Sequence, residues 1–428
     1  MQRSYMGPFV ISDDEADSGP SDPAAVLVLL NEIMATDYTA ESCPRLFAAL
    51  QKWIADGCDF GSIYSRVRYC SAASIDMGIE DSAIRLREFE QKRSLALDSS
   101  TNRIIHPHLQ PRRLWDLISN RVVPHDGSAM LDGAVSHSWM ADPQRVDTPI
   151  NNHEWPVPIP RDATLARVRI ELLNLGFKYV WLDVLCLRQK GAPDKESQRL
   201  DEWKVDVPTI GAVYHGTAQI VYYYSGLGRP FEVGDLSSER HWINRAWTLQ
   251  EISSNTIIAG RAASSPVLPS AKERPDSVTE QLYEKIAYLT VHVTSGGESI
   301  FPILEAMRFR FGTSELDKVA GLAYRLMART LPPYIDGQAP DDAWDALVTV
   351  MTTNFRGNIF LLFPQPGRGR YTWYPSWGQI TDRAVFLPSH DLFAHEPVEY
   401  DPSSNGSMRQ AVEMGWHSSL LLTVENAH

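Results

Sequence analysis

Cysteine is scarce in this chain of 428 residues, which contains only four: Cys43, Cys58, Cys70 and Cys186. No two of them have the Cys-x-x-Cys spacing of a zinc site or a redox motif, so we expect no metal site. So few cysteines in so long a chain fit a reducing compartment. Cys186 lies two residues from the end of a predicted strand and is interpreted as a small buried residue.

Long apolar runs are also missing. The longest, "AAVLVLL" at residues 24–30, is far too short to span a bilayer. The segment "MQRSYMGPFVISDDEADSGPSD" has no positive start followed by an apolar run, and therefore does not read as a signal peptide. We expect a cytoplasmic protein without a membrane span.

Basic residues are outnumbered, with 40 Lys and Arg against 53 Asp and Glu and a net charge of −13. Nucleic-acid binding depends on neutralising phosphates, so this balance disfavours it. An anionic membrane surface is disfavoured for the same reason. The apolar fraction of 43% and the charged fraction of 22% are ordinary for a globular protein, and the length predicts two to four domains.

Composition and periodicity divide the chain into five parts. The first part, rich in acidic residues, Ser, Pro and Gly, is predicted to be disordered. The second has apolar residues at helical spacing and a helix of alternating charge, "IEDSAIRLREFEQKR". The predicted boundaries are 1–22 for a disordered acidic tail, 23–111 for a helical region, 112–260 for a core, 261–331 for a helical extension, and 332–428 for a mixed α/β region.

In the core, predicted strands alternate with predicted helices. The strand candidates are "LDGAVSHSW", "YVWLDVLCL" and "AQIVYYYSG". The helix candidates are "DATLARVRIELLNLGFK", capped by Asp162 or Thr164 and ended by Gly176; "LDEWKVDVPTIGAVYHGT", interrupted at Pro208; and a helix opened by "TLQEISS". This alternation predicts a doubly wound, mainly parallel sheet with helices on both faces. In such sheets ligands bind beyond the carboxyl ends of the strands.

The C-terminal third gives weaker signals. "ASSPVLPSAKERPDS" is predicted to be a loop, and "VTEQLYEKIAYLTVHV" and "ELDKVAGLAYRLMART" are predicted helices. "NIFLLF" and "RYTWYPSW" are interpreted as strand-like pieces.

Four blocks in order, "AVSHSWM", "KYVWLDVLCLRQ", "DVPTIGAVYHGTAQIVYY" and "WINRAWTLQE", resemble the fungal heterokaryon-incompatibility (HET) domain. "RFRFGTSELDKVAGLAY" and "YPSWGQI" resemble the segments that often follow it. The resemblance covers roughly residues 112–325 and extends more faintly to about residue 380. The helical region before residue 100 lies outside it.

The resemblance implies a role in fungal non-self recognition and programmed cell death. HET domains also resemble Toll/interleukin receptor (TIR) domains, which implies a TIR-like or flavodoxin-like core. In TIR enzymes a glutamate in a Trp-x-Leu-x-Glu segment is catalytic in NAD cleavage, and Glu251 holds that place in this sequence. The chain differs from the TIR pattern at Thr248 and Ile252, and has no glycine-rich loop directly after Asp183.

Two interpretations of Glu251 are open. Thr248-x-x-Glu251 has the spacing of a helix capping box, flanked by Trp247 and Ile252 as a hydrophobic staple. Alternatively, Glu251 faces a nucleotide. Cleavage of the N-glycosidic bond of NAD passes through an oxocarbenium-like transition state, which one carboxylate can stabilise or capture. Because nicotinamide leaves as a neutral group, no general acid is needed.

Two of the supporting candidates carry charge and also have structural alternatives. Arg245 precedes the predicted helix mouth, where phosphate is readily held; the alternative is an ion pair with Asp235 or Glu239. Asp183 would contact a ribose hydroxyl or pair with Glu251; the alternative is a cap or turn acid.

The remaining candidate contacts to the nucleotide lie after the first two strands and beside Glu251: Ser136, His137, Trp139, Trp247 and Arg188. Structural roles, a satisfied histidine or core tryptophans, are the alternatives. Ser136 and His137 are adjacent in a predicted strand and should point to opposite faces, which disfavours a hydrolytic Ser–His dyad.

Three functions remain open at this level. The first is a cell-death effector that cleaves NAD to nicotinamide and ADP-ribose, with NAD as substrate and no bound cofactor. The second is a non-enzymatic signalling module that associates with itself or with a protein partner, and the third is an inactive family member kept for regulation. An open pocket lined by Glu251 would favour the enzyme, and a rim filled by side chains would favour the module.

Overall fold

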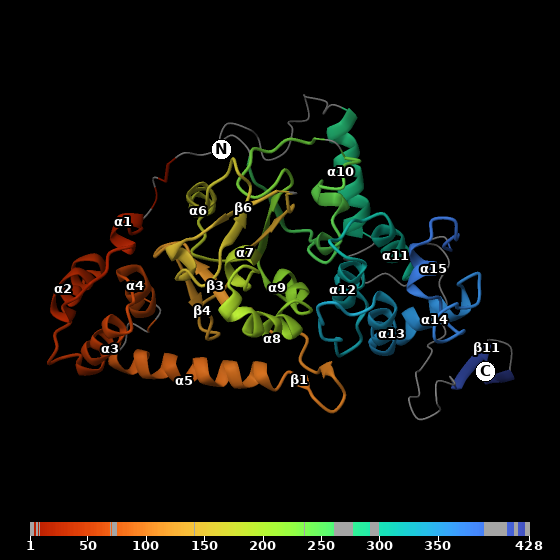
Figure 1. Cartoon of the computed structure of the whole chain (residues 1–428), viewed down its shortest axis with the longest axis horizontal. Helices are drawn as coiled ribbons and strands as arrows, with labels where there is room; N and C mark the ends of the chain where they lie inside the picture. The colour runs from red at the N-terminus through yellow and green to blue at the C-terminus, as the bar shows by residue number, and fades with distance from the viewer. Residues whose placement is uncertain are drawn as a thin grey trace.

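The computed structural model describes residues 4–5, 7, 9–68, 70, 75–140, 142–234, 236–260, 277–291 and 299–388, and the backbone of 409–414 and 418–423. The protein is mixed α/β, with N-terminal helices at one end, a sheet with its helices in the middle, and further helices at the other end (Figure 1).

A six-stranded mixed sheet forms the centre of the described chain, in the order β10-β9-β5-β8-β3-β4. The strands β10, β9, β5 and β8 run parallel, and the hairpin β3–β4 adds two strands, of which β3 runs antiparallel to β8. Their bounds are Arg113–Asp116 for β3, Arg121–Pro124 for β4, Gly133–His137 for β5, Tyr179–Leu182 for β8, Gln219–Tyr223 for β9 and Thr256–Ile258 for β10.

The three predicted parallel strands are confirmed as β5, β8 and β9. β8 is shorter than predicted, because the chain turns into the short helix α7 (Asp183–Cys186) directly after Leu182. The Asp183 carboxylate accepts a hydrogen bond from the Val184 amide at 2.7 Å and so favours the turn. The hairpin β3–β4 was not predicted.

Helices cover both faces of this sheet: α6 (Leu165–Asn174) on one side, and α8 (Glu196–Asp206) and α9 (Ile210–Gly216) on the other. Tyr223 of β9 donates a hydrogen bond to Glu171 of α6 at 2.8 Å. On the opposite face, the Trp181 ring of β8 lies 5.5 Å from the ring of Tyr214 in α9.

The predicted helix signals of α6, α8 and α9 are confirmed. Thr164 caps α6 by accepting a hydrogen bond from the Arg167 amide, and Gly176 follows its end with a φ of +86°. That left-handed conformation favours glycine. The break between α8 and α9 falls at Pro208, as expected of a residue without an N–H.

The N-terminal part contains helices that share a small hydrophobic core of their own. They are α1 (Asp13–Ala16), α2 (Pro23–Met34), α3 (Pro44–Ala55), α4 (Phe60–Arg68) and α5 (Ile75–Ser94), and α5 runs beneath the sheet domain (Figure 1). The helices predicted in this region are confirmed.

The prediction of a disordered tail is wrong for the described residues up to 22. Ile11 is fully buried, Asp13 pairs with Arg169 at 2.7 Å, and Asp17 pairs with Arg121 at 2.6 Å. Composition alone missed this because the acidic residues are held by arginines that lie more than a hundred positions away in the chain.

The C-terminal helices pack on the sheet domain, and a single hydrophobic core runs from Ala96 to Leu387. Their bounds are Ser277–Leu289 for α10, Phe301–Arg308 for α11, Glu315–Leu326 for α12, Pro340–Val350 for α13, Thr353–Leu361 for α14 and Trp377–Thr381 for α15. The helices predicted at α10 and α12 are confirmed. The predicted loop "ASSPVLPSAKERPDS" lies, apart from Ser277, outside the described residues.

Both strand-like pieces predicted near the C-terminus are wrong. "NIFLLF" belongs largely to α14, where Ile359 faces the core, and "RYTWYPSW" is irregular up to the start of α15. Short apolar runs do not distinguish a strand from a buried helix. Three short antiparallel pairs complete the described structure: β1 (Leu97–Asp98) with β2 (Arg103–Ile104), β6 (Gln144–Val146) with β7 (Val157–Ile159), and β11 (Arg409–Met414) with β12 (Ser418–Thr423).

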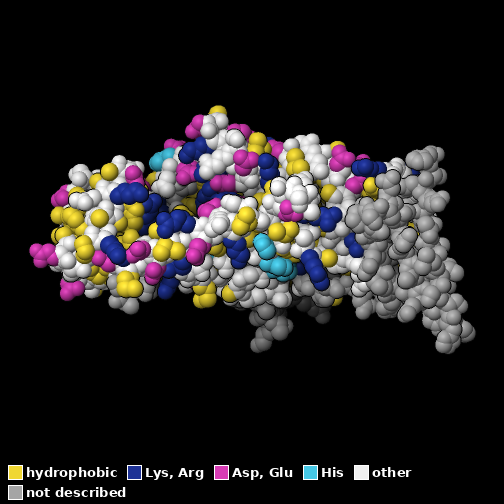
Figure 2. All heavy atoms as spheres, turned by 90° about the horizontal axis from the view of Figure 1, so that it is seen from below, with side chains coloured by type: hydrophobic (Ala, Val, Ile, Leu, Met, Phe, Trp, Pro, Cys, Tyr) yellow, Lys and Arg dark blue, Asp and Glu magenta, His cyan; other side chains and the backbone are white. Residues whose placement is uncertain are grey.

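No helix within the described ranges combines the length and apolar character needed to cross a bilayer. Acidic and basic side chains are interspersed over the face that Figure 2 shows, which carries no large patch of one sign.

Candidate functional site

The candidate site lies at the carboxyl ends of β5, β8 and β9. From β5 the chain moves to β8 on one side and then to β9 on the other side of β5. The loops therefore diverge between β5 and β9, which is where open α/β sheets bind ligands. Ser136 and His137 end β5, Asp183 follows β8, and Tyr222 lies near the end of β9.

Glu251 reaches this edge, and it does not belong to a capping box. The segment around it forms a 3₁₀ turn, η4 (Trp247–Leu249), and then leads into β10, so the helix predicted from "TLQEISS" is wrong. The Thr248 hydroxyl donates to the carbonyls of Trp242 and Arg245 at 2.7 and 2.8 Å instead of capping a helix. The Glu251 carboxylate accepts a hydrogen bond from the Ser136 hydroxyl.

The environment of Glu251 disfavours its charge. Burial raises its pKa from 4.5 to about 7, and the nearby charge of Asp183 adds to this; the Ser136 hydrogen bond, His137 and Arg310 oppose it. A carboxyl group in this range changes charge near neutral pH. Acids with strongly shifted pKa values cluster at functional sites, which makes Glu251 a candidate functional residue.

Ser136 is held from two sides. Its hydroxyl accepts a hydrogen bond from the Trp242 indole nitrogen at 2.7 Å while it donates to Glu251. Trp242 is fully buried and lies 4.7 Å from the ring of Tyr222, whose hydroxyl donates to the backbone carbonyl of Glu251 at 2.8 Å. Side chain and backbone of Glu251 are thus both fixed to the ends of β5 and β9.

A histidine–aspartate pair lies beside Glu251. His137 Nε2 is 2.8 Å from Asp183 Oδ1, and the Trp139 indole donates to Asp183 Oδ2 at 3.1 Å. Burial acts to lower the pKa of His137, but the charge of Asp183, its hydrogen bond and the charge of Glu251 together raise it. Ser136 and His137 therefore bond to different acids rather than to each other.

Two predicted contacts lie away from this cluster. The Trp247 ring packs against Tyr334, with 6.1 Å between centroids. Arg245 has no ion-pair partner within 4 Å among the described residues, a set that excludes Asp235. Burial and the charge of Arg240 lower the Arg245 pKa.

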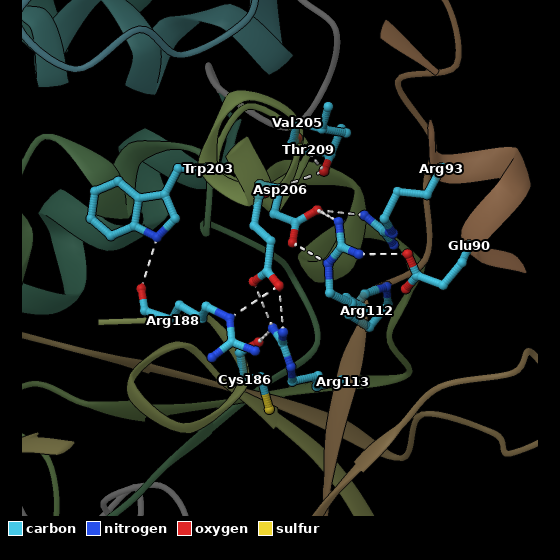
Figure 3. A network of polar contacts seen from close by, with 12 residues as sticks. Glu90, Arg93, Arg112, Arg113, Cys186, Arg188, Trp203, Val205, Asp206 and Thr209 are labelled. Atoms are coloured by element: carbon cyan, nitrogen blue, oxygen red, sulfur yellow. Dashed lines mark hydrogen bonds and ion pairs between the residues drawn. The ribbon is translucent and has the colours of Figure 1, made fainter. Parts of the chain in front are cut away.

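Arg188 belongs to a different network, part of which is shown in Figure 3. Its guanidinium donates to Glu202 at 3.1 Å, forms an ion pair with Glu154 at 2.5 Å, and lies 5.2 Å from the centroid of the Trp155 ring. Arg113 bonds to the same Glu202 at 2.7 Å. These contacts occupy Arg188 structurally, so the structure does not bring it to Glu251.

The same network ties the N-terminal helices to the sheet domain. Asp206 of α8 accepts bonds from Arg93 of α5 at 2.6 Å and from Arg112 at 2.9 Å, and Arg112 also pairs with Glu90 (Figure 3). Burial acts to raise the Asp206 pKa, but the two arginines lower it below its ordinary value. Asp206 thus joins α5 to α8 through the buried Arg93 and also binds the partly buried Arg112.

Sequence reasoning missed two residues of the site. Arg310, from the loop after α11, donates to the Arg245 carbonyl at 2.6 Å and the Thr248 hydroxyl at 2.7 Å. Burial lowers its pKa to about 9, although the charge of Glu251 opposes this. Gln250 is 1% exposed, and both of its amide atoms lack hydrogen-bond partners among the described residues. Arg310 lies 59 positions after Glu251, beyond the reach of any local pattern.

The edge is closed in this structure. Ser136 is fully buried and Glu251 is 7% exposed, whereas Trp139 at the rim is 36% exposed. A dinucleotide would reach Glu251 only after rim side chains move. Within the described residues, no group of three or more His, Cys, Asp or Glu side chains is placed to hold a metal ion.

Comparison with known protein families, curated proteins and solved structures finds no match to this chain. The side chains at this edge therefore indicate which chemistry is available. A buried carboxyl group that titrates near neutrality lies beside a histidine–aspartate pair and an indole ring. This set can stabilise a positive charge that develops on a sugar and can orient its hydroxyl groups.

Proposed function

We propose that this protein is a HET-type cell-death effector that cleaves the N-glycosidic bond of NAD, releasing nicotinamide and ADP-ribose. The observation that carries the proposal is the position of Glu251: a buried carboxylate bonded to Ser136 at the carboxyl edge, beside Asp183 and His137.

The strand order supports this assignment. Counted along the chain, the four parallel strands lie in the spatial order 2-1-3-4, since β8, β5, β9 and β10 are neighbours in that order. That is the order of doubly wound, flavodoxin-like sheets, whose ligands bind between strands 1 and 3. In this chain the position falls between β5 and β9, where Ser136 and Tyr222 both contact Glu251.

The proposed chemistry gives each side chain a role. The Glu251 carboxylate stabilises or captures the oxocarbenium ion as the bond to the neutral leaving group breaks, and water then adds to the same sugar carbon and loses a proton to solvent, which gives ADP-ribose. Ser136 holds that carboxylate in place. Asp183, oriented by His137 and Trp139, accepts hydrogen bonds from ribose hydroxyls.

A second function is favoured by one observation, the closed edge. With Glu251 7% exposed and Ser136 fully buried, the same cluster would serve as the polar core of a non-enzymatic module that acts by self-association or by binding a protein partner. Closed edges also occur in enzymes whose sites open when substrate binds, so activity has to be measured.

The test is incubation of the purified full chain with NAD over a range of protein concentrations, with free nicotinamide measured by chromatography and self-association by sedimentation. If the protein is the enzyme, the rate of nicotinamide release should rise in proportion to the protein concentration or more steeply. Concentration-dependent assembly without any release of nicotinamide would support the module instead.

A further inference from the structure

A cleft separate from Glu251 lies between the segment 108–111, the segment 125–131, the end of α9 and Tyr324 of α12. Its volume of about 570 Å³ falls in the range of small-molecule sites. Figure 2 looks at the lower face of the molecule and shows histidine side chains gathered near its middle.

The lining combines histidines with an apolar wall. His108 and His215 flank the Tyr324 ring, at 5.9 and 5.2 Å between ring centroids, and both histidines are exposed. The Tyr324 hydroxyl lies 3.0 Å from His108 Nδ1. Pro111 and Val213 contribute apolar surface.

The lining of the cleft contains no acid that would repel an anion. None of the described residues that line it is Asp or Glu. Asp126, next to the lining, is buried and already accepts bonds from Arg85 at 2.9 Å and Ser128 at 2.6 Å. Although His215 is exposed at the rim, partial desolvation and the positive charges of Arg325 and His108 lower its pKa to about 4, so its imidazole is neutral near pH 7.

We propose that this cleft binds a small organic phosphate, with the phosphate at the end of the cleft that His108 and His215 line and the organic part against Pro111 and Val213. A phosphate dianion accepts charge-assisted hydrogen bonds from imidazole N–H groups, and no acid in the lining repels it. The proposal concerns a site apart from Glu251 and does not depend on NAD cleavage.

The walls of the cleft connect directly to the Glu251 segment. In α9, His215 lines the cleft. Its neighbour Tyr214 points inward and donates a hydrogen bond to the Val135 carbonyl at 3.1 Å. Burial raises the pKa of Tyr214, and the charge of Glu251 adds to this. In α12, Tyr324 lies on the cleft.

The neighbour of Tyr324, Arg325, donates to the carbonyls of Gln250 and Ile252, at 3.3 and 2.7 Å. α12 therefore joins the cleft to the backbone on either side of Glu251, and α9 joins it to β5. We infer that a ligand in the cleft stabilises residues 245–252.

The experiment measures binding of AMP, adenosine and inorganic phosphate to the full chain by calorimetry. AMP is expected to bind at one site and more tightly than either fragment. The double variant His108→Gln/His215→Gln should weaken AMP binding at least about tenfold, the loss of roughly 1.4 kcal/mol. His106→Gln is the matched control, an exposed histidine that does not line the cleft, and should bind AMP like the parent.

Hydrogen–deuterium exchange reports the coupling without any need for catalysis. AMP should slow exchange in residues 245–252 of the parent and of Glu251→Gln, but not of the double histidine variant. Equal affinity for adenosine and AMP, unchanged AMP affinity in the double variant, or the absence of binding would overturn the site. Unchanged exchange in residues 245–252 of AMP-saturated parent protein would overturn the coupling.

Discussion

The Ser136 hydroxyl donates a hydrogen bond to the Glu251 carboxylate, although the two residues lie 115 positions apart in the chain. This bond joins the end of β5 to the segment that leads into β10. It directs the glutamate into the sheet edge, where Asp183 and His137 also lie, rather than back onto its own backbone. The site proposed for this protein follows from that one connection.

Replacing Ser136 by Ala should lower the stability of the protein and raise the pKa of Glu251. Trp242 would lose its acceptor and Glu251 its donor, so the free energy of unfolding should fall by about 1 to 3 kcal/mol in urea titrations. The Glu251 pKa should rise further, because the Ser136 bond lowers it, and the pH profile of any NAD cleavage should move to higher pH. Ser138→Ala, which removes a bond to the Tyr224 carbonyl, serves as the control and should leave that profile in place.

The Glu251→Gln variant should alter the dependence of stability on pH. The folded protein holds a proton on Glu251 between pH 4.5, where the unfolded chain loses it, and about 7. The free energy of unfolding of the parent should therefore fall across this window, by about 3 kcal/mol relative to Glu251→Gln. Parallel curves for the two proteins from urea unfolding at pH 5 to 8 would show that Glu251 is not buried as described.

The pair of His137 and Asp183 should act in the same direction as Glu251, because the pKa of His137 is also raised in the folded protein. The His137 pKa is raised above 6.5, so its contribution to stability is full below pH 6.5 and lost as the pH rises through the folded pKa. In Asp183→Asn, burial should dominate and bring the His137 pKa below 6.5. NMR titration of labelled histidines measures this shift, and the exposed His106 provides the internal reference.

Asp206 should be essential for the attachment of α5. Asp206→Asn removes the countercharge of the buried Arg93 and one of the two acids that pair with the partly buried Arg112, and the loss of one partner of a buried ion pair costs about 3 to 5 kcal/mol. Asp201→Asn on the same helix removes an exposed pair with Lys204 and should change stability by less than about 1 kcal/mol. Similar urea midpoints for both variants would contradict the role assigned to the network in Figure 3.

Local patterns predicted the elements of the core but not the contacts of its site. The three strands and helices α6, α8 and α9 were predicted because buried parallel strands and helix caps leave short-range signals. The segment from Thr248 to Glu251 has capping-box spacing, yet tertiary contacts from Trp242 and Arg310 direct it into a 3₁₀ turn.

Long-range ion pairs account for two further errors. The described part of the acidic N-terminal segment is ordered because Arg121 and Arg169 of the sheet domain bind Asp17 and Asp13. Arg188 follows a strand as a phosphate ligand would, but Glu202 and Glu154 bind it. Charge pairing across many residues is invisible to composition and periodicity.

The most direct test of the central claim is the rate of nicotinamide release from NAD at pH 8 by the parent and Glu251→Gln proteins, with Glu239→Gln, an exposed acid of the preceding loop, as control. The account predicts release by the parent and the control and a loss of at least about 100-fold in Glu251→Gln, with near-native stability. Equal rates in all three proteins, or none in the parent at any concentration, would contradict it.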